Sequence, residues 1–170
     1  MKNGIFISIL ALIFFSTLAY SAEKKKYLSP DGEYRAIVVT LSKSSYTSGE
    51  SEIFIETKDG KILCSKNYGS EDGEHGFGVE KAAWSSDSGF FVYSLSSSGG
   101  HQAWHFPTDF ISTTDYKFRR LDDFVGPITD PDFTLFAPDI IKTSGRDKTT
   151  LDATNFKVSL SQTIKNENTK

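Results

Sequence analysis

Residues 84–94 read WSSDSGFFVYS, a bulky apolar residue, a short run of turn formers and then an apolar segment. Residues 28–37 read LSPDGEYRAI and repeat the same order 56 positions earlier in the chain. In the earlier copy Pro presets φ, Asp accepts a hydrogen bond from its own backbone, and Gly tolerates a positive φ. Each copy therefore predicts a tight turn that leads into a β-strand.

This order resembles the blades of TolB-like and related WD40-like β-propellers, whose repeats commonly read apolar-Trp-Ser-Pro-Asp-Gly before a strand and a hairpin. The resemblance covers residues 28–68 as one blade and 79–121 as a second, and a degenerate third starts near residues 128–132. The later copy has Ser86 and Ser88 where the motif has Pro and Gly, and the third segment lacks the motif. The resemblance implies antiparallel, blade-like meanders.

The number of blades conflicts with a closed ring, because propellers have about 4–8 blades and this chain has room for about three. Either several chains complete one ring as a homo-oligomer, or the meanders pack as an open sandwich. We expect the second arrangement, because two sheets packed face to face cover their apolar faces without a partner. The predicted fold class is all-β, with antiparallel blade-like meanders packed as an incomplete propeller or open sandwich.

Alternating and β-branched segments support this class, and helical periodicity is hard to find. A hairpin is predicted where Asp59-Gly60 separates residues 52–57 from 61–64, because this turn requires a positive φ. The acidic, glycine-rich residues 69–76 predict an exposed loop. Other strands are expected at residues 33–41, 79–84, 90–95, 101–106, 116–121, 133–136 and 156–160. Residues 22–162 are expected to form a single domain, and 163–170 a disordered tail.

The N-terminus has the pattern of a secretory signal peptide over residues 1–21: Lys2, an apolar core of about 14 residues, and small residues before the cut. Cleavage after Ser21 would leave Ala22 as the first mature residue. A retained membrane anchor is the alternative, although a spanning helix needs about 20 apolar residues, and no other segment is long enough. The chain is therefore expected to be exported, either periplasmic or secreted, with no membrane span after signal removal.

The net charge and the single cysteine limit the kinds of partner and of covalent cross-link that we expect. Cleavage removes Lys2 and no acidic residue, so the formal net charge of −3 becomes −4. Because phosphate-backbone binding needs clustered Lys and Arg, no nucleic-acid partner is expected. Cys64 is the only cysteine, so no internal disulfide can form. Cys64 is read as a small buried hydrophobic residue, with an intermolecular bridge or a reactive thiol as the alternative.

The three histidines, His75, His101 and His105, are candidate ligands or catalytic groups. On a strand, His101 and His105 would share a face but stand about 13 Å apart, too far for one ion. The acidic residues at 71–74 and 130–132 do not have the spacing of a dedicated calcium loop. No Gly-x-Ser-x-Gly elbow or phosphate-binding loop is present. No metal site and no cofactor are therefore predicted.

Aromatic residues make up 14% of the chain and suggest a binding surface. In a strand over residues 101–106, Gln102, Trp104 and Phe106 would share one face, opposite His101 and His105. Trp84 is expected in the core, whereas Trp104 is read either as a core anchor or as an exposed binding residue. An exposed Trp104 would suit a protein or glycan partner.

The sequence thus favours an exported, non-catalytic β-module that binds another envelope or extracellular protein. The binding candidates are Gln102, Trp104, Phe106, His101, His105 and His75. The alternative is a small hydrolase or metal-dependent enzyme that uses His75, His101 or His105 with a nearby Asp.

Overall fold

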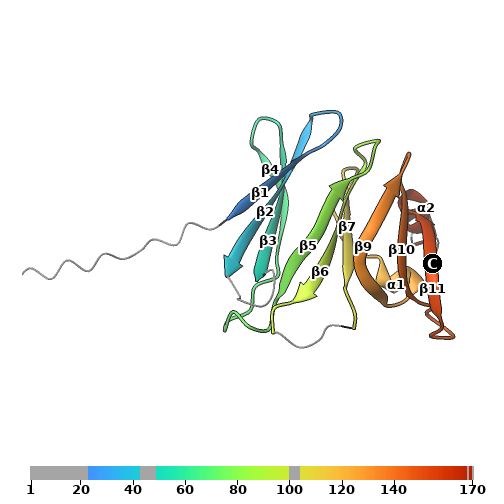
Figure 1. The fold of residues 1–170 in the computed structure, drawn as a ribbon. Coiled ribbons are helices and arrows are strands. Elements are labelled where there is room, and N and C mark those ends of the chain that lie inside the picture. Colours follow the sequence, from blue (N-terminus) through green and yellow to red (C-terminus); the bar gives the residue numbers. More distant parts are fainter. Residues whose placement is uncertain (1–22, 43–48, 100–103, 168, 170) are drawn as a thin grey trace, which may run out of the picture.

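The computed structural model describes residues 23–42, 49–99, 104–167 and 169. These residues form three antiparallel sheets that follow one another along the chain and lie side by side (Figure 1). Sheet 1 contains β1 (Lys24–Leu28), β2 (Tyr34–Ser42), β3 (Glu50–Thr57) and β4 (Ile62–Asn67), in that order. Sheet 2 contains β5 (Phe77–Trp84), β6 (Phe90–Ser97), β7 (Thr108–Ser112) and β8 (Phe118–Arg120). Sheet 3 has the order β11-β10-β9, with β9 (Ile128–Phe136), β10 (Ile140–Arg146) and β11 (Ala153–Ser159).

The two motif copies form equivalent turns, one before β2 and one before β6. Ser29 Oγ donates to Asp31 Oδ1 and Ser85 Oγ donates to Asp87 Oδ1, both at 2.6 Å. The same serine hydroxyls accept the backbone N–H groups of Tyr34 and Phe90, at 3.0 and 2.9 Å. The sequence repeat is therefore a structural repeat, as the sequence predicted.

The fourth residue after the apolar position of each motif copy takes a positive φ, 75° at Gly32 and 60° at Ser88. Serine thus adopts in the second turn the backbone conformation that glycine provides in the first. The two turns also touch, because the Asp31 N–H donates to Ser88 Oγ at 3.0 Å. The loss of the motif's glycine therefore leaves the second turn intact.

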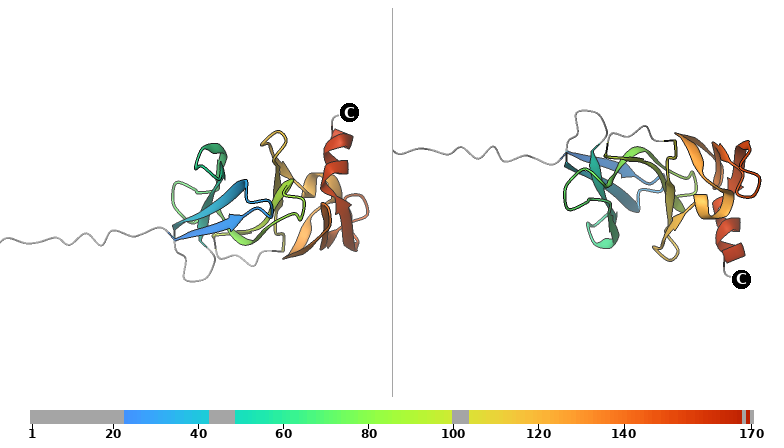
Figure 2. Two further views of the ribbon diagram at one scale, coloured as in Figure 1. Left: turned by 90° about the horizontal axis from the view of Figure 1, so that it is seen from above. Right: turned by 90° about the horizontal axis from the view of Figure 1, so that it is seen from below.

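Sheet 2 is the middle layer and separates two hydrophobic cores (Figure 2). Along β6, Phe91, Tyr93 and Leu95 face sheet 1, whereas Phe90 and Val92 face sheet 3. The alternation follows from the two-residue period of a strand. Because both of its faces are covered, β6 has seven consecutive buried residues.

Two helices close the space between sheets 2 and 3. These are α1 (Asp122–Val125) and α2 (Leu160–Glu167), and both contribute apolar side chains to the second core. Leu160 is fully buried, and Glu167 forms a 2.7 Å ion pair with Arg119 of β8. The expectation of a disordered tail after Gln162 was wrong, because α2 continues to Glu167. Buried Leu160 and half-buried Ile164 supply the apolar contacts that hold the helix in place.

The third meander differs most from the sequence prediction. It begins at Ile128 as expected, but residues 128–132 belong to β9 and not to a turn. The turn that corresponds to the other two motifs lies between β9 and β10, at residues 137–139. Strands β1, β7 and β10 were not predicted from sequence.

The all-β class is confirmed, and the described sheets do not close into a ring. Cys64 is half-buried against the first core, and this burial raises the pKa of its thiol. Trp84 also packs against that core, and its Nε1 donates to the Tyr27 carbonyl oxygen at 2.9 Å. Within the described residues, no helix has the length and hydropathy needed to cross a membrane. The predicted signal peptide, residues 1–21, lies outside them.

Candidate functional site

The described binding candidates, His75, Trp104, His105 and Phe106, lie in two segments at the same end of sheet 2. Phe77 pairs with Ser97 and Ser94 pairs with Thr108, so residues 69–76, 98–99 and 104–107 leave the sheet at one end (Figure 1). The two loops are joined where the Ser98 N–H donates to the Gly76 carbonyl oxygen at 3.0 Å. His101 and Gln102 lie outside the described residues.

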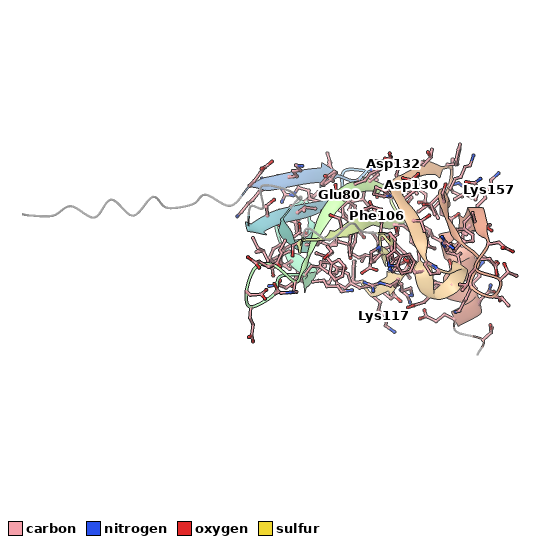
Figure 3. The ribbon with its side chains drawn as sticks, turned by 60° about the horizontal axis from the view of Figure 1, so that its bottom comes forward. Glu80, Phe106, Lys117, Asp130, Asp132 and Lys157 are labelled. Atoms are coloured by element: carbon pink, nitrogen blue, oxygen red, sulfur yellow. The ribbon has the colours of Figure 1, made fainter. Side chains whose placement is uncertain are left out.

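The prediction of a strand over residues 101–106 was wrong for its described part. Residues 104–107 have no strand conformation, so Trp104 and Phe106 do not share a strand face. The segment is nevertheless anchored, because the Phe106 N–H donates to the Ile128 carbonyl oxygen and the Pro107 carbonyl oxygen accepts from Leu95, both at 2.8 Å. Phe106, which is labelled in Figure 3, is half-buried.

Trp104 is a surface residue with 66% of its area exposed, which answers the question that its sequence context left open. Its ring centroid lies 5.3 Å from that of the His105 imidazole, with an angle of 32° between the planes. His105 Nε2 lies 2.5 Å from Asp122 Oδ1, and this carboxylate is nearly buried. The exposed Trp104 ring therefore packs on the His105 imidazole, which is held in place by Asp122.

Asp122 holds this corner together. Besides His105, its carboxylate accepts the backbone N–H groups of Thr108 at 2.9 Å and Ile128 at 3.1 Å. One side chain at the start of α1 thus connects the first residue of β7, the first residue of β9 and the support of Trp104. We call Trp104, His105, Phe106 and Asp122 the aromatic corner.

His75 lies in the other loop, on Asp72. The two side chains are 73% and 53% exposed, and His75 Nδ1 lies 2.5 Å from Asp72 Oδ2. The Glu74 backbone N–H and the Ser70 hydroxyl donate to Asp72 Oδ1, at 3.0 and 2.8 Å. These hydrogen bonds, together with the contact to His75, hold the pKa of Asp72 well below its usual value.

Glu50, at the start of β3, fixes the loop of residues 69–76 from below. It is 2% exposed and accepts hydrogen bonds from the Ser70 N–H at 2.9 Å, the Gly76 N–H at 2.7 Å and the Ser98 hydroxyl at 2.9 Å. Burial would raise the pKa of Glu50, but the bonds from these three residues outweigh it and the pKa is lowered. Gly76 is required here, because a Cβ atom would meet the Tyr68 carbonyl oxygen and the Glu50 carboxylate.

The two described histidines do not share a carboxylate, because His75 contacts Asp72 and His105 contacts Asp122. Within the described residues, no three His, Cys, Asp or Glu side chains are close enough to hold a metal ion. The acidic residues at 130–132, which were considered as calcium ligands, make other contacts. Asp132 pairs with Lys81 at 3.0 Å, and Asp130 Oδ1 accepts the Asp132 N–H at 2.9 Å.

A second polar cluster lies between sheets 1 and 2, around Asp109 of β7. This fully buried carboxylate accepts hydrogen bonds from Lys66 at 3.0 Å, Tyr68 at 2.5 Å and Arg120 at 2.9 Å. Burial would raise the pKa of Asp109, but the bonds from Arg120 and Tyr68 and the charge of Lys66 outweigh it, so the pKa is lowered. Burial raises the pKa of the neighbouring Tyr93 phenol. The cluster ties two sheets together, and its carboxylate has no access to solvent.

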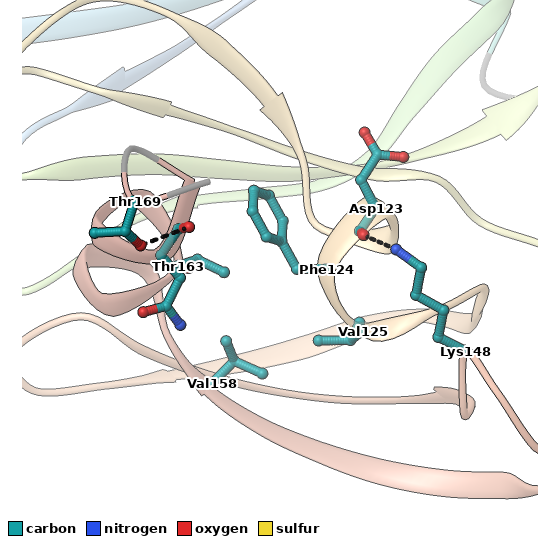
Figure 4. A pocket seen from close by; sticks show the side chains of 8 residues that line it. Asp123, Phe124, Val125, Lys148, Val158, Thr163 and Thr169 are labelled. Atoms are coloured by element: carbon teal, nitrogen blue, oxygen red, sulfur yellow. Dashed lines mark hydrogen bonds between the residues drawn. The ribbon is translucent and has the colours of Figure 1, made fainter.

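A pocket of about 720 Å³ lies between α1 and α2 (Figure 4). Phe124, Val125 and Val158 provide apolar walls, and Lys148 Nζ donates to the Asp123 carbonyl oxygen at 2.5 Å. The titratable side chains that line the pocket are Asp123 and Lys148. Both of these side chains are exposed, so the pocket has apolar walls but no buried acid or base.

Sequence reasoning found Trp104, His105 and His75 but missed the carboxylates that hold them. Asp122 follows a predicted strand and belongs to no motif. Its role as an acceptor for His105, Thr108 and Ile128 becomes visible only in the folded chain, where the start of β9 lies beside it. Asp72 was read as part of a solvated acidic loop, which its exposure supports. No family model, curated protein or solved structure matches this chain.

Proposed function

We propose that the chain is an exported, non-catalytic β-module that binds another envelope or extracellular protein through the aromatic corner. The observation that carries this proposal is the 66% exposure of Trp104 on an anchored His105. Tryptophan is enriched among residues that dominate binding energy, because a large rigid ring buries much area at little entropic cost. The N-terminal pattern of residues 1–21 supports export.

The support beneath Trp104 favours a binding role. His105, Asp122 and the backbone bonds of Phe106 and Pro107 fix the segment before any partner arrives. A preorganised residue loses less conformational freedom on binding than a mobile one. His75 and His105 each contact a different Asp, so these two histidines do not converge on one carboxylate, the arrangement that would favour the hydrolase alternative.

Photo-crosslinking in the producing cell tests the proposal. A benzophenone amino acid is placed at Trp104 and, as the matched control, at Lys157, which is exposed on sheet 3. We expect a discrete protein adduct from position 104 and none from position 157. Equal labelling from both positions, or no adduct from position 104, would refute the proposal.

The partner identified in this way is then titrated with the Trp104→Ala variant. Loss of a central tryptophan typically costs about 2 kcal/mol or more, which corresponds to an affinity loss of about 30-fold. Because the side chain is exposed, the variant should unfold at the same temperature as the parent.

The N-terminus of the exported protein, read by intact mass, should be Ala22. A glycan array probed with both proteins distinguishes a carbohydrate partner.

A further inference from the structure

Sheet 3 has one strand fewer than the other two sheets. Sheets 1 and 2 each contain four strands in the order of the chain, whereas sheet 3 ends at β11 and the chain continues into α2. Within the described residues, β10 is the only strand that pairs with β11. Figure 1 shows β11 at the end of the molecule that is opposite to sheet 1. No described strand therefore occupies in sheet 3 the position that β4 and β8 occupy in sheets 1 and 2.

The hydrogen bonds at the two ends of the β10–β11 hairpin fix which backbone groups of β11 face this open edge. The Asp147 N–H donates to the Asp152 carbonyl oxygen at 2.9 Å, and the Leu160 N–H donates to the Asp139 carbonyl oxygen at 3.1 Å. Hydrogen-bonded pairs alternate along an antiparallel ladder, so every second residue between these ends is bonded to β10. The bonded residues of β11 are Thr154, Phe156 and Val158. The exposed residues whose N–H and C=O groups point to the open edge are Ala153, Asn155 and Lys157.

The edge of β11 lacks the features that usually prevent the addition of a strand. Such features are short strands, lysines, prolines and bulges. The other five edge strands of the described sheets each have one: β1 starts with three lysines, β8 has three residues, β9 contains Pro131, and β4 and β5 pair with a register shift. In contrast, β11 has seven residues in unbroken register with β10, no proline and a single lysine. Its edge is therefore suited to pair with a further strand.

The pocket between α1 and α2 lies on the inner side of this edge. Val158 of β11 lines the pocket and packs against the second core, and Lys148 lines it from the loop that precedes β11. Figure 4 shows Thr163 on one side of the pocket and Val125 with Lys148 on the other. A strand added about 4.8 Å beyond β11 would place an inward side chain next to Val158. The apolar walls of the pocket would then receive that side chain.

The outer face of sheet 3 is positively charged beside the same edge. The register places Thr134, Lys142 and Lys157 in one row across the three strands. Both lysines are exposed, and no ion pair within the described residues involves either of them. Because the backbone groups of Lys157 point to the edge, one residue of an added strand would lie directly opposite it. Opposite charges stabilise such cross-strand pairs, so an acidic residue fits this position.

We propose that the edge of β11 binds an extended segment of a partner protein as a fourth strand of sheet 3. The segment runs antiparallel to β11, as β4 and β8 do to their neighbours. Main-chain hydrogen bonds to Asn155 and Lys157 contribute affinity, and the side-chain positions provide selectivity. The segment carries an acidic residue opposite Lys157 and apolar residues directly before and after it, one of them beside Val158. The recognised chemistry is an apolar-acidic-apolar sequence in an extended chain.

This site shares no residue with the aromatic corner, so the failure of either proposal leaves the other standing. A benzophenone amino acid at position 157 replaces the ammonium group that pairs with the acidic residue. The crosslinking control at position 157 should therefore not capture the segment.

A synthetic peptide with blocked ends, Thr-Thr-Phe-Glu-Val-Thr-Thr, serves as the probe, and amide hydrogen exchange of the protein is followed by NMR. In the free protein, the amides of Asn155 and Lys157 should exchange rapidly, whereas those of Phe156 and Val158 are protected by β10. A short flexible peptide loses much conformational freedom on binding, so we expect a dissociation constant on the order of 100 µM. At about 1 mM peptide, exchange at Asn155 and Lys157 should slow about tenfold.

Two substitutions at Asn155 test the main-chain contact. Asn155→Pro removes the N–H that points to the edge and no bond to β10, and proline is tolerated at such edge positions. Asn155→Ala keeps the N–H and is the matched control. We expect Asn155→Pro to weaken peptide binding about tenfold and Asn155→Ala to bind as the parent does.

A charge exchange tests the side-chain contact and does not depend on the folding of the proline variant. Lys157→Glu should bind the glutamate peptide about tenfold more weakly than the parent. The same variant should regain parental affinity for Thr-Thr-Phe-Lys-Val-Thr-Thr, because opposite charges again face each other. Recovery with the second peptide also shows that the variant is folded.

Three results would overturn the proposal. The first is unchanged exchange at Asn155 and Lys157 in the presence of about 1 mM of the glutamate peptide. The second is an equal loss of affinity in Asn155→Pro and Asn155→Ala, or no recovery in the charge exchange. The third is protection of these two amides in the free protein that rises with protein concentration, which would show that a second copy occupies the edge.

Discussion

At the scale of single residues, buried carboxylates organise the molecule. Asp109 stays charged without solvent because Lys66, Tyr68 and Arg120 donate to its oxygens. Lys66 and Arg120 are each about one third exposed, at 36% and 37%, so the two cations reach water while their shared anion does not. The cluster therefore joins β4 of sheet 1 to β7 and β8 of sheet 2 through one ionised group.

Because the pKa of Asp109 lies below its usual value of 3.8, its charge stabilises the fold above that pH. This contribution should be lost as the pH falls through the lowered pKa, when the folded protein must also take up the proton. We expect Asp109→Asn to reduce stability by about 3 kcal/mol at pH 7 and to flatten the dependence of stability on pH below about 4. Urea unfolding at several pH values measures both effects.

Asp123 is exposed, so Asp123→Asn is the matched control and should keep the parental dependence of stability on pH. An Asp109→Asn protein with parental stability at pH 7 would show that the cluster contributes no net stability.

At the scale of elements, the Ser-x-Asp turn forms the same hydrogen bonds in both copies, although Ser86 and Ser88 replace the Pro30 and Gly32 of the first copy. In each turn, the serine hydroxyl binds an Asp oxygen and the N–H that starts the next strand. The Asp oxygen then accepts an N–H two residues further on, from Glu33 in one copy and Gly89 in the other, both at 3.0 Å. The Ser and Asp side chains that form these bonds are therefore the same in the two copies, whereas the residues at the other turn positions differ.

Ser85→Ala should therefore lower the free energy of unfolding by about 1–2 kcal/mol, because Ser85 is fully buried and the Phe90 N–H would lose a partner. Ser86→Ala is the matched control one residue away. Ser86 is exposed and makes a single 3.3 Å bond to the Pro138 carbonyl oxygen, so its loss should change stability by less than about 0.5 kcal/mol. Thermal unfolding followed by circular dichroism compares the two, and equal effects would contradict the assigned role of Ser85.

The sequence predicted the elements that depend on neighbouring residues, such as tight turns and alternating strands. The Asp59-Gly60 hairpin and the strands around β2 and β6 follow from turn chemistry and alternation, and Gly60 has the positive φ of 86° that this turn requires. The segment before Pro107 alternates as a strand would, yet residues 104–106 form no strand, and the Phe106 N–H donates to the Ile128 carbonyl oxygen instead. Helix α2 was missed for a similar reason, since its apolar contacts come from distant residues such as Phe110 and Phe133.

At the scale of the whole molecule, sheet 2 belongs to both cores at once. Phe91 and Ile111 pack toward sheet 1, and their neighbours Phe90 and Phe110 pack toward sheet 3. Sheets 1 and 3 therefore do not share a core with each other, but each depends on the same central strands. Loss of either outer sheet would expose to water one face of β6, which is buried on both sides in the folded protein.

We therefore expect the three sheets to unfold as one unit. Ile53→Ala in the first core and Leu160→Ala in the second should each lower stability by about 3 kcal/mol and move the same single transition, because both residues are fully buried. In a Trp104→Phe background, Trp84 fluorescence reports on the first core. Its midpoint should coincide with that of the far-ultraviolet circular dichroism and should shift equally in both variants. The exposed Lys142→Ala should shift neither signal. If Leu160→Ala leaves the Trp84 transition in place while part of the dichroism is lost earlier, sheet 3 unfolds separately and the middle sheet does not couple the two cores.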